Sequence, residues 1–261
     1  MVRYVFGINP SIAALRAHAD QVERVHLAEG AHQGALKEIV ARARRAGLRV
    51  DHLPRVRLTS MVEGAVHQGV VLEMKEYTYA QPEDFVAAAK SAGEQPLIVI
   101  LDGIQDPQNL GAIVRSAHAF GAHGVVVSKD RAAGVTGAAS KASAGALEHL
   151  PVARATNLAR VLEVYKEAGV WIAAATPDGD RLPQQLDLKG SSALVVGAEG
   201  GGIRRLLLER SDFRVRIPIR GATGSLNASV AAAVLLYEAH RQRMAEPELA
   251  APTKGSGRQK E

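Results

Sequence analysis

Five consecutive apolar residues, Leu-Ile-Val-Ile-Leu at positions 97–101, constrain the fold of this 261-residue chain more than any other feature. An uninterrupted apolar run of strand length is typical of a parallel sheet whose two faces are both covered by helices. Further strands of this kind are expected at 125–127, 170–175, 193–196 and 215–217, and helices at 110–120, 158–168, 203–209 and 226–243. We therefore predict an α/β domain with a parallel sheet over residues 96–244.

A smaller α/β domain is predicted over residues 1–75. Its strands are expected at 4–6, 22–27, 48–53 and 69–74, and one helix at 35–46. Asn9 followed by Pro10 predicts the start of another helix, with asparagine as the cap and proline in the first turn.

Two segments lack these patterns. Residues 76–95 contain Pro- and Gly-bearing stretches around a short polar helix and are predicted to be an interdomain linker. Residues 245–261 are dominated by Pro, Gly and charge, which predicts a disordered tail. The helix that precedes this tail is apolar on nearly every side at 228–236, so it should be buried in the core or against a partner subunit.

Composition narrows the possible functions. The chain has 32 Lys and Arg against 27 Asp and Glu, and this positive balance favours an acidic partner while leaving RNA, DNA and anionic membrane open. Cysteine is absent, which excludes disulfides, thiolate metal sites and cysteine nucleophiles. The nine histidines show no metal-ligand spacing, so we expect no metal. Neither a signal peptide nor a membrane-spanning run is evident, so a cytoplasmic location without a membrane partner is expected.

Six arginines lie between positions 42 and 57, in the smaller domain. They are Arg42, Arg44, Arg45, Arg49, Arg55 and Arg57. They either form a phosphate-binding face or a solvated helix face, and charge alone does not decide between the two.

Residues 102–117 link the first buried strand of the larger domain to a helix. Asn109 and Arg115 should therefore lie at the carboxyl edge of the sheet, where open α/β folds bind their ligands. The alternative interpretation is that Asn109 only caps the helix and Arg115 is a surface charge.

Two further loops repeat the order strand, glycine-rich turn, helix. Residues 194–203 carry Glu199 among glycines but match neither the P-loop nor the dinucleotide-binding turn, which argues against a nucleotide phosphate cradle. Residues 217–230 carry Ser225, which could simply cap the last helix. The Gly-x-Ser-x-Gly elbow is missing, so hydrolase chemistry is disfavoured.

In order and spacing, these three loops together resemble the three motifs of the SpoU (TrmH) family of RNA ribose 2′-O-methyltransferases. Residues 6–9 and 64–69 resemble the substrate-binding domain of the RlmB-type enzymes, which methylate a guanosine of large-subunit (23S) ribosomal RNA. Ala228 departs from the family pattern, where valine is more usual. The resemblance implies a SPOUT catalytic domain with a deep C-terminal trefoil knot. It also implies S-adenosylmethionine as methyl donor and a homodimer.

The resemblance also implies roles for individual residues. It places the donor against the backbone near Gly197, Ile217 and Leu226. Arg115 would lie near the target ribose as a base or as an electrostatic activator, and the strong basicity of guanidinium makes the second role physically easier. The residues implied to orient Arg115, the ribose and the donor are Asn109, Glu199, Ser225 and Asn227.

Ribosomal RNA is thus the expected partner, and the 2′-hydroxyl distinguishes it from DNA. Two alternatives stay open. The first is a tRNA ribose or rRNA adenosine methyltransferase of the same family. The second is a non-catalytic RNA-binding protein, which would not require the polar residues of all three loops.

Overall fold

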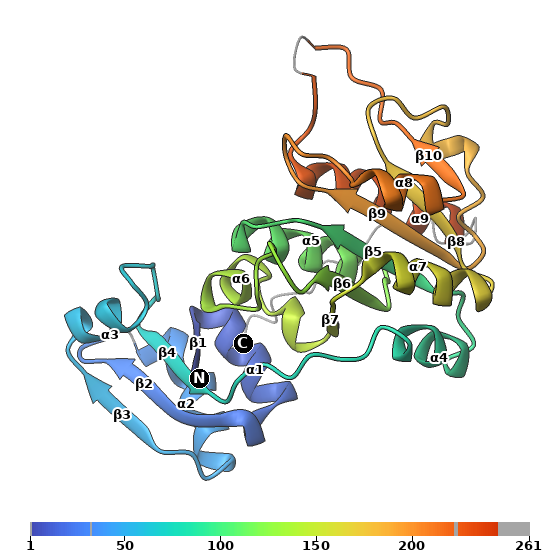
Figure 1. Cartoon of the computed structure of the whole chain (residues 1–261). Coiled ribbons are helices and arrows are strands. Elements are labelled where there is room, and N and C mark those ends of the chain that lie inside the picture. Colours follow the sequence, from blue (N-terminus) through green and yellow to red (C-terminus); the bar gives the residue numbers. More distant parts are fainter. Residues whose placement is uncertain (1, 32, 222–223, 245–261) are drawn as a thin grey trace.

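The computed structural model of the chain describes residues 2–31, 33–221 and 224–244, which form two sheets with their covering helices (Figure 1). The sheets are separated in the chain by residues 75–96. The predicted disordered tail, residues 245–261, lies outside the described residues.

The N-terminal sheet has four strands in the order β1-β4-β2-β3. The strands are β1 Arg3–Phe6, β2 Val22–Ala28, β3 Val50–Leu53 and β4 Val70–Met74, and the helices are α1 Ile8–Ala17, α2 Gln33–Arg45 and α3 Arg55–Met61. The pair β2 and β3 is parallel, since α2 forms the crossover between them, whereas β4 runs antiparallel to both β1 and β2. Apolar side chains of α1 and α2, such as Leu15 and Ile39, pack against Val25 and Leu72 of this sheet.

Several details differ from the sequence-based expectation. Gly7, with φ 92°, is the N-cap of α1, so Asn9 lies inside the first turn rather than at the cap. The expected strand at 215–217 is β10 Phe213–Val215, whose parallel pairing with residues 173–175 ends at Val215. Helix α3 was not predicted. It buries only Leu58, so it carries no amphipathic pattern long enough to recognise.

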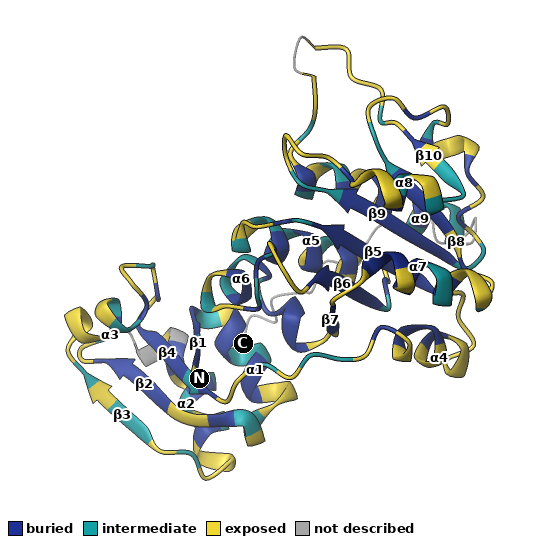
Figure 2. Ribbon diagram, in the orientation of Figure 1, coloured by how far each residue is buried: buried dark blue, intermediate teal, exposed yellow. Residues whose placement is uncertain are grey.

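The larger sheet is entirely parallel, as predicted, in the order β10-β8-β9-β5-β6-β7. Its other strands are β5 Leu97–Asp102, β6 Gly124–Ser128, β7 Val152–Ala155, β8 Trp171–Ala175 and β9 Ser192–Gly197. Residues of β5 are buried on both faces (Figure 2), which explains the continuous apolar run.

Two layers of helices cover this sheet. Helices α5 Pro107–Ala119, α6 Gly137–Ala142 and α9 Ala228–Arg243 pack on the face reached by Leu97, Val99 and Leu101. Helices α4 Asp84–Ser91, α7 Leu158–Glu167 and α8 Arg205–Arg210 pack on the face reached by Ile98 and Ile100. Short 3-10 helices are Ala19–Gln21, Ala146–Glu148 and Pro183–Gln185. Strand β7 and helix α6 were not predicted.

The proposed linker, residues 76–95, packs on the larger sheet over much of its length. The Tyr77 hydroxyl accepts a hydrogen bond from the Val152 amide at 3.1 Å. Phe85 of α4 is buried beneath β6, where a Cβ on Gly124 would lie 2.4 Å from its ring. Glycine is therefore required at position 124 for α4 to approach the sheet.

Within the described ranges, none of the helices combines the length and the apolar character needed to cross a membrane.

Candidate active site

Three loops meet at the carboxyl edge of the larger sheet. Strands β5 and β9 are parallel neighbours, so the loops that follow them leave the sheet on the same side. The first loop leads to Asn109 in the first turn of α5, the second carries Glu199, and the third ends at Asn227 immediately before α9.

Asn109, Glu199 and Asn227 form one hydrogen-bonded cluster, which we call the polar triad. The Asn109 Nδ2 donates to Glu199 Oε1 at 3.0 Å. The Asn227 Nδ2 donates to Asn109 Oδ1 at 3.0 Å and to Glu199 Oε1 at 2.5 Å. Residues up to 118 positions apart in the chain thus converge at the sheet edge.

The alternative interpretation, in which Asn109 and Ser225 only cap the two adjacent helices, is not what the structure shows. Asp106 caps α5 by accepting from the Gln108 amide at 2.9 Å, so Asn109 is not the cap and its side chain faces the triad. Asn227 caps α9, since its Oδ1 accepts from the amides of Ser229 and Val230. Ser225 is therefore an exposed loop residue two positions before the cap.

An ion pair between the buried Asp102 and the exposed Arg204, which the sequence analysis missed, closes the glycine-rich turn. Asp102 at the end of β5 accepts from the Arg204 amide at 2.8 Å and from Arg204 Nε at 2.7 Å. Its only sequence signal is an acidic residue that ends an otherwise apolar strand. Gly197 is also required here, because a Cβ would lie 2.2 Å from the Gly202 carbonyl carbon, where the turn folds back on itself.

A cavity of about 600 Å³ opens beside the triad. Gly197, Ile217 and Leu226, the predicted donor-binding residues, all line it, together with Glu199 and Ser225. A volume of this size suits a small organic ligand. Its glycine-rich wall leaves room, since a Cβ at Gly200, Gly201 or Gly202 would meet nothing within 4 Å. Apolar side chains and bare backbone are suited to hold a nucleoside-like molecule by its rings and edges.

Arg115 is the one predicted residue that the structure does not bring to this site. It is exposed on α5, six residues after Asn109, which corresponds to a rise of about 9 Å and a rotation of about 120° around the helix. Its side chain makes no hydrogen bond or ion pair with another residue of the described ranges. No group of three or more His, Asp or Glu side chains capable of holding a metal occurs among the residues that the structure describes.

Comparisons with known proteins identify the family of this chain. A model described as the SpoU rRNA Methylase family matches residues 96–237, and one described as RNA 2′-O ribose methyltransferase substrate binding matches residues 4–80. The putative TrmH family tRNA/rRNA methyltransferase YacO of Bacillus subtilis is 43% identical, over 92% of this chain and 96% of the relative. The 23S rRNA (guanosine-2′-O-)-methyltransferase RlmB of Coxiella burnetii is 38% identical, over 94% of this chain and 97% of the relative.

Solved structures show the same fold. The SpoU methyltransferase AviRb from Streptomyces viridochromogenes, in complex with AdoMet, has a TM-score of 0.75 and 25% identity, covering 92% of this chain and 89% of its own. The family predicted from the three loops is thereby confirmed.

Proposed function

We propose, since the chain belongs to the SpoU rRNA methylase family of RNA ribose 2′-O-methyltransferases, that it methylates the 2′-hydroxyl of a guanosine in large-subunit (23S) ribosomal RNA. The observation that carries the proposal is the polar triad, whose Glu199 also lines the cavity formed by Gly197, Ile217 and Leu226. Support for guanosine comes from relatives named RlmB, 38% and 40% identical.

The donor is S-adenosylmethionine, in agreement with the AdoMet complex of AviRb. When bound, it supplies an electrophilic methyl group on a sulfonium, and this transfer needs no metal. In the proposal, the backbone at Gly197, Ile217 and Leu226 holds the donor in the cavity. The cavity has the volume and the side-chain-free wall that this role requires.

The triad and Ser225 orient the reacting groups in this scheme. A carboxylate and two amides that are bonded to one another present fixed donors and acceptors, and fixed placement can supply a large share of the barrier reduction for group transfer. Arg115 acts as the electrostatic activator of the ribose hydroxyl, since a guanidinium does not release its proton near neutral pH.

A homodimer completes the proposal. Val230, Val234 and Tyr237 are 47%, 38% and 54% exposed, and their spacing of four and three residues places them on one stripe of α9. Such a stripe on a helix that is apolar nearly all round favours a second copy of the chain as its cover. Arg115 lies away from the triad of its own chain. In the proposal, the Arg115 that acts at each site is therefore supplied by the second copy of the chain.

The remaining parts of the proposal concern substrate, location and topology. The first is that the domain over residues 1–75 contacts the RNA, in agreement with the match to a substrate-binding model. The second is that the protein acts in the cytoplasm, without a DNA or membrane partner. The third is that the segment leading to α9 forms the trefoil knot implied by the family resemblance. A tRNA substrate is the second candidate, because relatives such as YacO are named tRNA/rRNA methyltransferases.

One experiment separates these substrates. The protein is incubated with methyl-labelled S-adenosylmethionine and transcripts of large-subunit rRNA, small-subunit rRNA or tRNA, and the modified ribose is then mapped. We expect label at one guanosine of the large-subunit transcript. Label confined to tRNA, or at an adenosine, would overturn the proposed substrate, and absence of transfer to every RNA would overturn the proposed reaction.

A further inference from the structure

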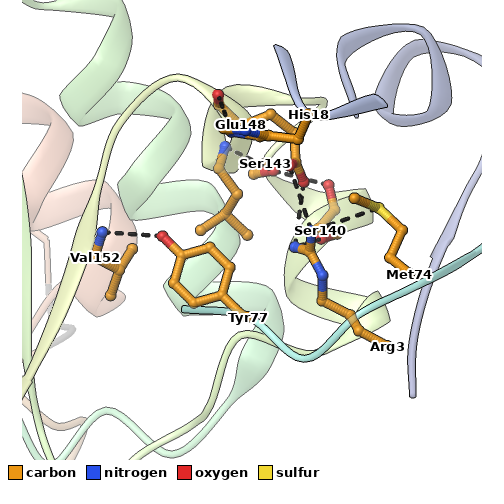
Figure 3. A network of polar contacts seen from close by, with 9 residues as sticks. Arg3, His18, Met74, Tyr77, Ser140, Ser143, Glu148 and Val152 are labelled. Atoms are coloured by element: carbon orange, nitrogen blue, oxygen red, sulfur yellow. Dashed lines mark hydrogen bonds and ion pairs between the residues drawn. The ribbon is translucent and has the colours of Figure 1, made fainter. Parts of the chain in front are cut away.

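The first strand of the N-terminal domain reaches into the larger domain through one side chain (Figure 3). Arg3 of β1 and Glu148 form an ion pair in which Nη1 lies 3.2 Å from Oε1 and Nη2 lies 3.4 Å from Oε2. The two side chains are only 8% and 1% exposed. Nη1 also donates to the Ser140 Oγ of α6 at 3.4 Å. A charge pair this deeply buried demands a defined geometry, because either charge left without its partner would be desolvated and uncompensated.

Residues 140–148 of the larger domain, which we call the docking segment, contact the N-terminal domain at two more places. The Glu148 carbonyl oxygen lies 3.1 Å from the Nε2 of His18, at the end of α1. The Lys141 ammonium donates to the carbonyl of Val66, in the loop between α3 and β4. Contacts at β1, at α1 and at this loop fix both the distance and the rotation of one domain relative to the other.

Close backbone approach reinforces these contacts. A Cβ on Gly137 would lie 2.5 Å from the Tyr4 carbonyl oxygen, and one on Gly145 would lie 2.6 Å from the Ala13 Cβ. The two domains therefore touch where the larger one has no side chains. This is packing of the kind found inside a single domain.

The docking segment begins in helix α6, and α6 packs against the helix that carries Asn109 of the active site. Helix α6 packs on α5 so closely that a Cβ on Gly111 would lie 2.4 Å from the Ala139 carbonyl oxygen. Helix α5 carries Asn109 of the polar triad as well as Arg115. A continuous path of close contacts thus runs from Arg3 through α6 to the helix that bears the reacting site.

We propose that Glu148 is a positioning residue, which holds the RNA-contacting domain at a fixed offset from the methyl-donor cavity and so selects the ribose that is methylated. This inference rests on the proposed function. Displacement of reacting groups by about 1 Å can cost on the order of a hundredfold in rate, so a loosened domain contact should be visible in catalysis. Neither donor binding nor phosphate contacts should depend on it directly, because Glu148 is buried at the domain contact and does not line the cavity.

The test uses full-length Glu148→Gln and Arg3→Met, with Glu209→Gln as the matched control. Glu209 pairs with Arg205 on the surface, so its substitution removes an ion pair without touching the domain contact. For Glu148→Gln we expect a donor Kd within about twofold of the parent and a kcat/KM for a large-subunit rRNA transcript at least about tenfold lower. We also expect methyl groups at riboses neighbouring the parent target. The double variant should lose no more than Glu148→Gln alone, since both changes remove one interaction.

A second variant covers the case in which Glu148→Gln fails to fold. Ala13→Leu crowds Gly145 and pushes the domains apart while leaving the ion pair residues and every charge in place. It should show the same loss of single-ribose selectivity. Parent-like kcat/KM and a single modified ribose in whichever of the two variants is folded would overturn the inference, as would losses that add in the double variant. The proposed function fails separately, because in that case the parent protein itself does not methylate the transcript.

Discussion

The Asn227 side chain serves two structures at once, since its Oδ1 accepts from the Ser229 amide at 2.9 Å while its Nδ2 donates to Glu199 Oε1 at 2.5 Å. The N-cap of α9 and the polar triad thereby share one residue. A mutation can remove one of these two roles of Asn227 and keep the other.

Asn227→Asp should abolish activity without unfolding the protein. A carboxylate keeps the cap and is favoured at a helix N-terminus, but it cannot donate to Glu199 and places a second negative charge beside it. We expect methyl transfer to fall at least about a hundredfold, with a urea midpoint near that of the parent. Asn227→Ala should lose both functions and cost about 1 kcal/mol of unfolding free energy. Activity in Asn227→Asp comparable to the parent would show that the Nδ2 donor is dispensable.

Arg115→Ala should abolish methyl transfer while donor binding, folding and dimerisation persist. Arg115 is exposed and off the buried stripe of α5, so its removal leaves helix packing intact. Arg115→Lys should restore little, because an ammonium cannot reproduce the planar fork of a guanidinium. Single-turnover methylation with RNA and donor both saturating measures the effect, and Arg205→Ala, at another exposed arginine, is the control. A near-normal rate for Arg115→Ala would assign the role to another residue.

Gly201→Val should weaken donor binding by at least about tenfold. A side chain at position 201 has free space and lies on the cavity wall, so it occupies ligand volume without disturbing the fold. Gly190→Val is the matched control, since it also has free space but lies away from the cavity. Calorimetry with S-adenosylmethionine measures both, and a chelator should change neither value. Equal affinities would place the donor elsewhere, and chelator-sensitive binding would contradict a metal-free site.

Acid should destabilise the N-terminal domain through His67. Burial lowers the pKa of His67 below its ordinary value, and the positive charges of Arg55 and Lys141 lower the pKa further. The neutral ring fits its contacts, since Nδ1 accepts from the Gly69 amide and Nε2 lies 3.1 Å from the Thr59 hydroxyl.

The unfolded chain binds the His67 proton at a pKa of about 6.5. The contribution of His67 to stability is therefore complete above that pH and is lost as the pH falls towards the lower folded pKa. His67→Gln should have a flatter stability profile than the parent between about pH 7 and 5.5, by less than about 1.4 kcal/mol per pH unit. Urea titrations of the parent, His67→Gln and the exposed-site control His52→Gln measure this, and parallel profiles for all three would contradict it.

Val234→Glu should dissociate the proposed homodimer. A charge on the exposed apolar stripe of α9 would be buried without a partner in the dimer but solvated in the monomer. Sedimentation should show the monomer for this variant and the dimer for both the parent and Val56→Glu, at an exposed valine on α3. If Val234→Glu sediments as the parent does, α9 is not the interface.

The sequence predicts those parts of the molecule whose place in the fold is set by a local pattern of residues. Leu97 to Leu101 predict a central strand because both sheet faces are covered, and Asn109 could be assigned to the carboxyl edge because it follows that strand. Arg115 is predicted at the same edge, but its position six residues farther along α5 takes it away from the triad. Contacts that depend on tertiary packing were not accessible in this way. The pairings of Asp102 with Arg204 and of Arg3 with Glu148 join residues more than 100 positions apart. The spacing of apolar residues along the sequence carries no information about such distant pairs.

The contact of Phe85 with Gly124 restricts how this protein can vary during evolution. The ring occupies the place of a Cβ at position 124, so a larger residue there is compatible with the fold only after the ring has become smaller. That first step leaves a void under β6, which is itself costly, whereas the reverse order produces a clash. Substitutions at the two positions are therefore coupled. The segment between the domains is restricted in sequence by the sheet that it covers.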